Sequence, residues 1–472
     1  MTYTATIGIE CHVQLKTKTK LFTGADNDAR DKAPNTTISP LCLGLPGTLP
    51  VLNAEAISLA IRAGIALKAE IASLSRFERK HYFYPDLPLG YQITQLAEPV
   101  IGRGSVEFTT PDGEKHTVRI HHAHLEADAG KLTHPAGKDY SLVDLNRSGT
   151  PLIEIVSEAD MHSPAEAKAY AQELYLLMTY ADVTDGDLYH GNMRFDINVS
   201  VSKTDELGTR TETKNLNSFK SVERAAEYEI KRQIELLEKG GTVVQETRGW
   251  DEAKQKTVSQ RSKENAHDYR YFPDADLPPV RVSQQRIDKV KATMLLLPQA
   301  FRDSWQELSL DSTVIPALLA SSHTANLIER LHKEHGASVA RRTALWFSSV
   351  QSEEGSEATP TVPDAYYVEL ANMVDKNEIN SNAAKTLFVD MHSTTTSPRV
   401  LAEQKNLLQQ SDEGEIAKIV DEVLVGPASQ KALEDIRAGN DKAIGYLVGQ
   451  VMKLSKGKAN PALAQELIRR KL

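Results

Sequence analysis

The sequence predicts an α+β protein in which a large antiparallel sheet precedes a helical region and a small helical tail. Strand-like runs with two inserted helices fill the chain as far as Pro279. Beyond that residue proline becomes sparse and helical periodicity dominates, and from about Ser411 a short module contains two well-marked helices. We therefore expect three domains, at residues 1–292, 293–408 and 409–472.

The predicted strands are recognised by alternation of apolar and polar residues. In residues 7–15, Ile9, Cys11 and Val13 fall on one face, so Cys11 is expected in the core. A hairpin is predicted around Pro111-Asp-Gly113, and its second strand continues towards Glu126 and Asp128. Further strands are expected at 152–156, 193–201 and 209–214.

Helix boundaries carry clear local signals. Ser163-Pro164-x-Glu166 combines an N-cap, a proline at the first helical position and a capping-box glutamate. A second helix should run over 218–239 and end at Gly240-Gly241. Near the C-terminus an apolar stripe from Ile444 to Met452 and a start at Asn460-Pro461 predict the tail helices. The polar, acidic tract 348–363 indicates an exposed loop.

Composition limits the class of protein. Charged residues make up 25% and hydrophobic residues 40% of 472 positions, the balance of a globular protein rather than a disordered one. No run approaches the roughly 20 apolar residues of a membrane span. The net charge of −9 argues against a protein that coats nucleic acid, and two cysteines cannot build a disulfide framework. We expect a cytoplasmic protein with neither a membrane nor DNA as partner.

Four strand candidates carry acidic or metal-ligating residues two positions apart. The pairs are Glu10 with His12, Glu126 with Asp128, Asp196 with Asn198, and Glu212 with Lys214. Residues two apart in a strand share a face, so a common polar face could hold Mg²⁺ and nucleotide phosphates. A solvated sheet surface explains any one pair more simply. With four pairs and few lysines, both interpretations remain open.

Two further segments suggest a site. Asn146 and Arg147 precede a Gly-Thr-Pro turn and could bind a phosphate or carboxylate, although an ordinary surface turn would look the same. Residues 79–86 place three consecutive aromatics beside Lys80, which a packed strand would also explain. Phosphate-loop, zinc-helix and nucleophile-elbow motifs are missing from the sequence, so it offers no other common chemistry.

An ordered series of motifs resembles one family across nearly the whole chain. The motifs occupy residues 80–88, 124–131, 144–156, 212–219, 268–273 and 457–461. They are similar to those of the B subunits of tRNA-dependent glutamyl/aspartyl amidotransferases. The resemblance implies a cradle domain related to glutamine synthetase. It also implies ATP-dependent phosphorylation of the side-chain carboxylate of Glu or Asp on tRNA. Ammonia would come from an amidase partner, the A subunit, and a small C subunit would complete the complex.

The resemblance also implies roles for individual residues, with ATP and Mg²⁺ as cofactors. A structural zinc is not expected, because Ser39 stands where relatives carry the first thiol of a Cys-x-x-Cys pair ending at Cys42. The implied metal ligands are Glu10, His12, Glu126, Asp128, Glu154 and Glu212. The implied catalytic residues are Glu10, Glu126, Asn146, Arg147 and Lys214, with Asn198 and Asn215 for ATP or substrate and Lys80 and Tyr84 for the ammonia channel.

The tail supplies the basic charge that the rest of the chain lacks. From Gln450 to the C-terminus six lysines and arginines accompany one acid, Glu466, and few aromatics, which favours phosphate and shape contacts over base stacking. A solvated C-terminal face would give the same composition. The predicted tRNA-binding residues are Lys453, Lys458, Arg469 and Arg470. Two rival functions stay open, a stand-alone ATP-dependent carboxylate–amine ligase and a non-catalytic tRNA-binding adaptor.

Overall fold

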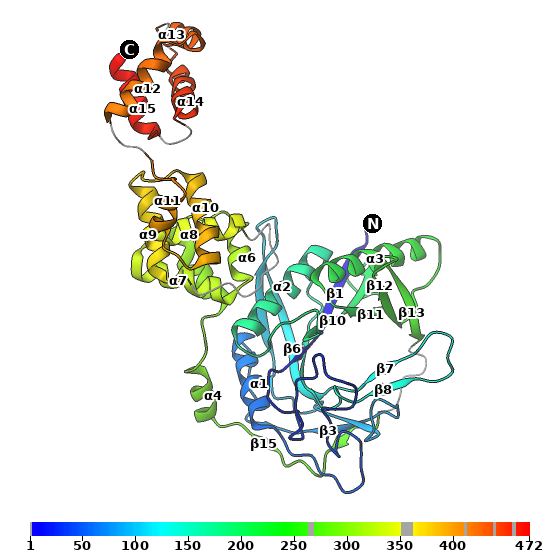
Figure 1. Cartoon of the computed structure of the whole chain (residues 1–472). Coiled ribbons are helices and arrows are strands. Elements are labelled where there is room, and N and C mark those ends of the chain that lie inside the picture. The colour runs from blue at the N-terminus through cyan, green and yellow to red at the C-terminus, as the bar shows by residue number, and fades with distance from the viewer. Residues whose placement is uncertain (1, 263–268, 351–361, 410–412, 438–439, 456–458) are drawn as a thin grey trace. The chain divides into compact units, whose positions relative to one another are not determined.

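The computed structural model describes residues 2–262, 269–350, 362–409, 413–437, 440–455 and 459–472. It divides into two compact units, Met1–Pro298 and Gln299–Leu472, which are described separately (Figure 1). The first unit is mixed α/β and the second is helical, which confirms the predicted order of a large sheet followed by helices. The division into three domains stays a prediction.

An eight-stranded sheet forms the body of the first unit. Its strand order is β13-β12-β11-β10-β1-β9-β6-β5, and all neighbours are antiparallel except β11 and β12. The predicted strands are present, although the one expected at 209–214 lies at 211–216, and β1 lies centrally between β10 and β9. The bounds are β1 (Thr4–Gln14), β5 (Gly104–Thr109), β6 (Lys115–Ala127), β9 (Pro151–Ser157), β10 (Met193–Ser202), β11 (Thr211–Leu216), β12 (Glu246–Asp251) and β13 (Lys256–Ser262).

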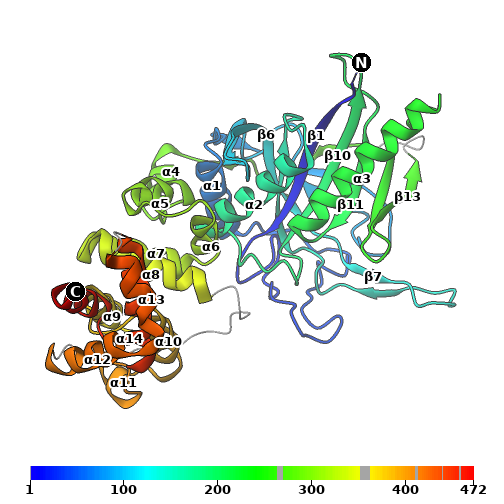
Figure 2. The same ribbon diagram turned by 90° about the horizontal axis from the view of Figure 1, so that it is seen from above.

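Three small sheets accompany the large one. In both Figure 1 and Figure 2 the hairpin of β7 and β8 extends away from the rest of the unit. One small sheet joins β14 (Phe272–Pro273), β3 (Glu78–His81) and β4 (Tyr91–Thr94). The others pair β15 (Val280–Arg281) with β2 (Leu74–Ser75), and β7 (Lys131–Thr133) with β8 (Leu142–Asp144).

Local signals determine where the helices of this unit begin. Ser163 Oγ accepts the backbone N–H of Glu166, and the Glu166 carboxylate accepts the N–H of His162, so the predicted capping box starts α2 (Pro164–Tyr180). Ser218 Oγ accepts the backbone N–H of Ser221 and so caps α3 (Phe219–Glu238), without a capping-box carboxylate. In both views α3 lies along β10 and beside α2 (Figure 2). The other helices are α1 (Ala54–Ala66) and α4 (Gln284–Lys291).

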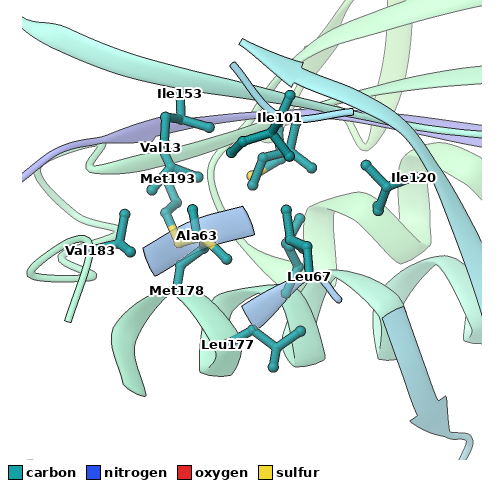
Figure 3. Close-up of a cluster of buried hydrophobic side chains, with 14 of the residues drawn as sticks. Val13, Ala63, Leu67, Ile101, Ile120, Ile153, Leu177, Met178, Val183 and Met193 are labelled. Carbon is teal, nitrogen blue, oxygen red and sulfur yellow. The ribbon is translucent and has the colours of Figure 1, made fainter. Parts of the chain in front are cut away.

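The core of the unit lies between the apolar face of the sheet and helices α1 to α3. Figure 3 shows Val13 of β1, Ile153 of β9 and Met193 of β10 facing Ala63 and Met178 of the helices. Cys11 is fully buried here, as its position in the alternation predicts. Full burial of such aliphatic side chains contributes roughly 1.5–3 kcal/mol each. The helices therefore cover one face, and the polar residues of the same strands project from the other.

The second unit is built of helices, the last four of which share a core of their own. Of the predicted stripe, Ile444, Leu447 and Val451 are buried in that core. None of the described helices combines the length and apolarity that a membrane crossing requires. The helices are α5 (Pro298–Ser304), η2 (Trp305–Leu308), α6 (Val314–Leu319), α7 (Ser322–His335), α8 (Ala337–Val350), α9 (Asp364–Asp375), α10 (Ser381–Thr394), α11 (Pro398–Gln404), α12 (Glu413–Val425), η3 (Pro427–Ser429), α13 (Gln430–Arg437), η4 (Asp441–Ala443), α14 (Ile444–Leu454) and α15 (Pro461–Lys471).

The loop predicted at 348–363 begins later in the structure than the sequence indicated. Residues 348–350 are the last residues of α8, so the helix continues further than the composition of the tract indicated. Residues 351–361 lie outside the described residues.

Candidate active site

Strand register gathers the predicted acidic residues on one face of the large sheet. In β1, Glu10 lies opposite Asp196 of β10, and His12 lies opposite Glu154 of β9. Glu154 also lies opposite His124 of β6. Because alternate residues of a strand share a face, all five side chains project away from the helix-covered core.

Two imidazoles and two carboxylates form the first group, here termed the histidine cluster (His12, His124, Glu126 and Glu154). His12 Nε2 lies 3.7 Å from Glu126 Oε1 and 3.4 Å from Glu154 Oε2. His124 Nε2 lies 3.7 Å from Glu126 Oε2 and 3.5 Å from Glu154 Oε2. Ligands about 2.0–2.1 Å from a Mg²⁺ ion lie roughly 3–4 Å apart, so His12, Glu126 and Glu154 fit a divalent cation.

The histidine cluster neutralises its own charge by holding protons. Burial disfavours an imidazolium at His12, but the hydrogen bond and charge of Glu154, with the charge of Glu126, raise its pKa to about 9. Burial alone would raise the pKa of Glu154, yet His12 and His124 lower it well below the usual value. A bound divalent cation supplies the same compensation, because metal binding and protonation compete for one set of ligands.

Three carboxylates form the second group, here termed the carboxylate cluster (Glu10, Asp196 and Glu212). One oxygen of each lies within 4.8 Å of the others, a second set suited to a hard cation. Lys214 Nζ donates to Asp196 Oδ2 at 2.9 Å and lies 3.1 Å from Glu212 Oε1. Asn198 Nδ2 donates to Glu10 Oε1 at 3.0 Å, which orients that carboxylate.

Charge repulsion is not fully compensated in the carboxylate cluster. Burial, followed by the nearby charges of Glu154 and Glu212, raises the pKa of Glu10, although Lys214 opposes the shift. Glu10 and His12 are two residues apart in β1, so the two clusters are about 7 Å apart along the strand. The arrangement can hold cations and a chain of phosphate groups side by side.

Comparison with known proteins identifies the family of the chain. Residues 5–288 match the family described as the GatB/GatE catalytic domain, and residues 326–472 match the family described as the GatB domain. The chain belongs to the GatB family. Among relatives named as the B subunit of aspartyl/glutamyl-tRNA(Asn/Gln) amidotransferase, those of Caldanaerobacter subterraneus and Geotalea daltonii are 44% and 45% identical over the full length of both chains. The relative from Alcanivorax borkumensis is 45% identical, also over both full lengths.

In this GatB-family chain, Asp128 and Arg147 lie outside both clusters. Asp128 follows the end of β6, and its Oδ2 lies 2.9 Å from Arg194 Nη2 and 3.3 Å from Arg147 Nε. Arg147 also donates to the carbonyls of Ala129 and Gly130 at 3.0 and 2.8 Å. Asp128 is thus placed to orient two guanidinium groups, and no metal position is formed around it among the described residues.

The structure places Asn146 in a buried contact between two loops and Asn215 at an exposed bulge, neither of which the sequence indicated. Asn146 is buried, and its Oδ1 accepts the N–H groups of Thr36 and Thr37 at 2.7 and 2.9 Å, so it holds the preceding loop against the 144–150 turn. Asn215 is exposed and has a positive φ of 69° where β11 shifts register against β10. Such a bulge redirects neighbouring side chains, and asparagine tolerates this conformation better than most residues.

The two predicted channel residues differ in environment. Lys80 Nζ lies 4.9 Å from the ring centre of Tyr269. Burial opposes its charge, but Tyr271 and the carboxylates of Glu126 and Glu154 raise its pKa, which places Lys80 within the field of the histidine cluster. Tyr84 is 46% exposed, and its ring centre lies 5.7 Å from that of Tyr82.

The predicted tRNA-binding residues that the structure describes are exposed. Lys453 is at the end of α14, and Arg469 and Arg470 are in the last turn of α15. Arg470 donates to Glu466 one turn earlier. Lys458 lies outside the described residues.

His124 and Asp196 were not among the predicted metal ligands, although Asp196 belonged to a predicted pair and the sequence contained a signal for each. His124 precedes Glu126 by two residues, and Asp196 precedes Asn198 by two, so each follows the same alternation as the predicted ligands. His124 is 8% exposed and contacts both carboxylates of its cluster. Extending the pair of Glu126 and Asp128 by two residues towards the N-terminus includes His124. Counting Asp196 of the third pair as a candidate ligand completes the carboxylate cluster.

Proposed function

We propose that this chain is the activating component of a tRNA-dependent amidotransferase. It would use ATP to phosphorylate the side-chain carboxylate of Glu-tRNA(Gln), Asp-tRNA(Asn) or both, and then amidate it with ammonia. The observation that carries the proposal is the pair of adjacent cation-binding clusters on the open face of the sheet. Membership of the GatB family supports the same function. We extend the proposal to a cradle domain of the glutamine synthetase type.

The chemistry explains why such a face is needed. A carboxylate does not react with ammonia, because its anionic oxygen is a poor leaving group. In the first step a carboxylate oxygen bonds to the γ-phosphorus of ATP as the bond to ADP breaks. In the second step ammonia bonds to the carbonyl carbon, the bond from that carbon to the phosphate oxygen breaks, and the proton lost from nitrogen passes to the leaving phosphate. Phosphoryl transfer depends mainly on positioning and on neutralised charge, which carboxylates, Lys and bound cations provide.

The residues of the two clusters would bind Mg²⁺, and Lys214 would bind phosphate. Glu10, Asp196 and Glu212 would hold one Mg²⁺, and His12, Glu126 and Glu154 would hold another. Mg²⁺, when bound, neutralises the phosphate oxygens and fixes their geometry. Lys214 is held against the carboxylate cluster by its two acidic neighbours and is placed to contact a phosphate oxygen.

Ammonia would reach the site from a partner. We propose an amidase as its source, in the position of the A subunit, and a small C subunit as the third component. Lys80, whose pKa responds to the charges of Glu126 and Glu154, is placed to line the end of the ammonia path. Tyr84, which is half-exposed beside Tyr82, is proposed as a second residue of that path.

The test is a transamidation assay with each charged tRNA. With ATP, Mg²⁺ and ammonium, the complete complex is expected to form ADP and the tRNA-bound amide only when mischarged tRNA is present. Amide formation from free glutamate by this chain alone would support the rival stand-alone ligase. Unchanged amidation after loss of Glu10 or Glu126 would instead support a tRNA-binding adaptor.

The basic tail should govern affinity for tRNA and leave chemistry unchanged. Replacing Arg469 and Arg470 by alanine is expected to raise KM for charged tRNA roughly tenfold at constant kcat, because each is proposed to contact a phosphate. Titrating salt should show a shallower dependence of KM in the double variant. Lys385→Ala on α10 serves as a matched loss of exposed charge. An equal effect of Lys385→Ala would mean that general charge, and not the tail, attracts tRNA.

A further inference from the structure

A buried lysine and a buried thiol lie side by side outside the two clusters. Lys20 is fully buried, and its Nζ lies 3.5 Å from the Sγ of Cys42. The other two partners of this amine are the carbonyl oxygens of Ser148 and Leu145, at 2.7 and 3.4 Å. None of the three partners is a carboxylate. The proposed amidation chemistry uses neither the amine nor the thiol.

Burial of this kind favours the neutral amine at Lys20. Removal from water disfavours an ammonium ion and lowers the pKa of Lys20, although the thiol of Cys42 opposes the shift. A neutral amine has a lone pair and is a nucleophile, whereas an ammonium ion is not. The fold therefore brings a nucleophilic nitrogen into contact with an oxidisable sulfur.

A hydroxyl group holds the thiol from another direction. Ser39 Oγ lies 3.3 Å from Cys42 Sγ and accepts the backbone N–H of Cys42 at 3.4 Å. The hydrogen of the same hydroxyl group can therefore be donated to the sulfur. Such a bond stabilises the thiolate, which is the form of cysteine that reacts with oxidants.

A cavity of about 40 Å³ gives small molecules access to the thiol. Cys42 lines it together with Ser148, Gly149 and mainly apolar residues such as Leu87, whereas Lys20 is not one of its lining residues. A water molecule needs only about 10–15 Å³ of such space, so a molecule as small as hydrogen peroxide fits. Oxidant and amine can thus reach the sulfur separately.

Lys20 also fastens the turn that carries Arg147, a predicted catalytic residue. Its Nζ donates to the carbonyl of Ser148, and its side chain crosses Gly149, where a Cβ would lie 3.6 Å from Lys20 Cδ. Gly149 has a φ of 83°, which favours glycine, and its N–H donates to the carbonyl of Asp128 at 2.9 Å. The carboxylate of Asp128 lies 3.3 Å from Arg147 Nε. Movement of the amine therefore affects the support of the Arg147 guanidinium.

We propose that Cys42 and Lys20 form an oxidative modification site, in which a peroxide joins them through a sulfur–nitrogen bond. In the first step Cys42 Sγ bonds to one oxygen of hydrogen peroxide as the O–O bond breaks. The sulfur loses two electrons, water is formed and a sulfenic acid remains. In the second step the lone pair of Lys20 Nζ bonds to sulfur, the S–O bond breaks, and the hydroxyl group leaves as water with a proton from nitrogen. The product is a sulfenamide, which a thiol reductant returns to thiol and amine.

The cross-link changes what Lys20 can donate. An ammonium nitrogen has three N–H groups and a free amine has two, whereas the sulfenamide nitrogen keeps one. It can therefore no longer serve both carbonyls, at Ser148 and Leu145. The new bond is also much shorter than the present 3.5 Å, so Nζ moves towards Cys42. Oxidation thus loosens the turn below Arg147 and inhibits amidation reversibly. This inhibition rests on the proposed function, and the cross-link does not.

Peptide mapping after mild treatment with hydrogen peroxide tests the cross-link. In the full chain, the peptides that contain Lys20 and Cys42 are expected to appear joined, at their summed mass less two hydrogens, and to separate when a thiol reductant is added. Cys11, which is fully buried in the hydrophobic core, is the internal reference and should stay a free thiol. In Lys20→Arg, whose guanidinium stays protonated, Cys42 should instead stop at a sulfenic acid that dimedone traps.

The parent chain alone decides whether the cross-link forms, so the result does not depend on how well a variant folds. Oxidation of Cys42 to a sulfinic acid without joined peptides would overturn the proposal, because the amine would then not capture the sulfenic acid. An unreacted Cys42 would overturn it as well. So would equal oxidation of Cys11, since selectivity for Cys42 would be lost.

Amidation by the complete complex tests the inhibitory effect, with ammonium as the nitrogen donor so that the amidase is bypassed. Peroxide is expected to lower the rate roughly tenfold or more, because misplacement of a positioned group costs that much, and a thiol reductant should restore it. Cys42→Ser carries the same partners and should keep its rate in peroxide. Unchanged amidation by a cross-linked sample would overturn the inhibitory effect. Failure of the untreated complex to amidate would contradict the proposed function, while peptide mapping would still report the cross-link.

Discussion

Glu10→Gln is expected to reduce amidation of charged tRNA by about a thousandfold or more while leaving the fold intact, because transition-state charge stabilisation at such sites is worth that much. The amide keeps the shape of the side chain and can still accept the hydrogen bond from Asn198. What it removes is one of the three negative charges in the carboxylate cluster. The measurement is single-turnover amidation in the complete complex.

Although Glu10→Gln should lose activity, it should not lower the melting temperature of the chain. Burial and the charges of Glu154 and Glu212 raise the pKa of Glu10, so its ionised form is unfavourable in the metal-free fold. Without divalent cations, Glu10→Gln should therefore melt at or above the temperature of the parent chain. Glu114→Gln, in the exposed turn before β6, is the control and should change neither property. A marked loss of stability in Glu10→Gln would mean that the side chain is structural.

Glu229→Ala is expected to destabilise the first unit by about 3–5 kcal/mol, the usual cost of breaking a buried charge network. Glu229 of α3 is fully buried and accepts from Thr211 of β11 at 2.8 Å and from Arg232 at 2.7 Å. Arg248 Nε of β12 lies 3.0 Å from the same carboxylate. Alanine would remove the one carboxylate that joins Thr211, Arg232 and Arg248, and it would loosen α3 from the edge of the sheet. Urea unfolding and hydrogen exchange of β11 to β13 measure the loss.

This contribution of Glu229 should depend on pH in one direction. Burial opposes its charge, but the hydrogen bonds from Arg232, Thr257 and Thr211 lower its pKa below the usual 4.5. Its folded pKa is thus the lower one, so the stabilisation is complete above 4.5 and is lost as pH falls towards the folded value. Glu223→Ala, which removes a partly exposed ion pair with Lys168, is the control and should cost about 1 kcal/mol at most. Equal losses in the two variants would contradict the buried network.

Much of the sheet and its polar face could be predicted from alternation alone. The strands around Glu10, Glu126, Asp196 and Glu212 are found where the period of two predicts them, and Cys11 is in the core. The helix at Pro164 begins at its predicted capping box. Such signals are local, since they depend on residues within one turn or one strand.

Contacts between residues far apart in the sequence could not be predicted from these local patterns. Asp128 follows Glu126 by two residues, as His12 follows Glu10 in β1. It nevertheless lies past the end of its strand, where Arg147 and Arg194 balance the charge of its carboxylate. Asn146 resembles a phosphate-binding residue, but its side-chain oxygen is instead bound to the backbone of residues 36 and 37. In both positions the competing partner is supplied by another part of the chain.

The sequence by itself determined which residues share a face, where helices begin and which family the chain resembles, because these depend on local spacing and on motif order. Only the tertiary structure decided which strands are neighbours. Strand order divides the acidic residues between two clusters and places His124 beside Glu126 and Glu154. Register between strands far apart in the chain is fixed by packing of the whole core, and no local pattern encodes it.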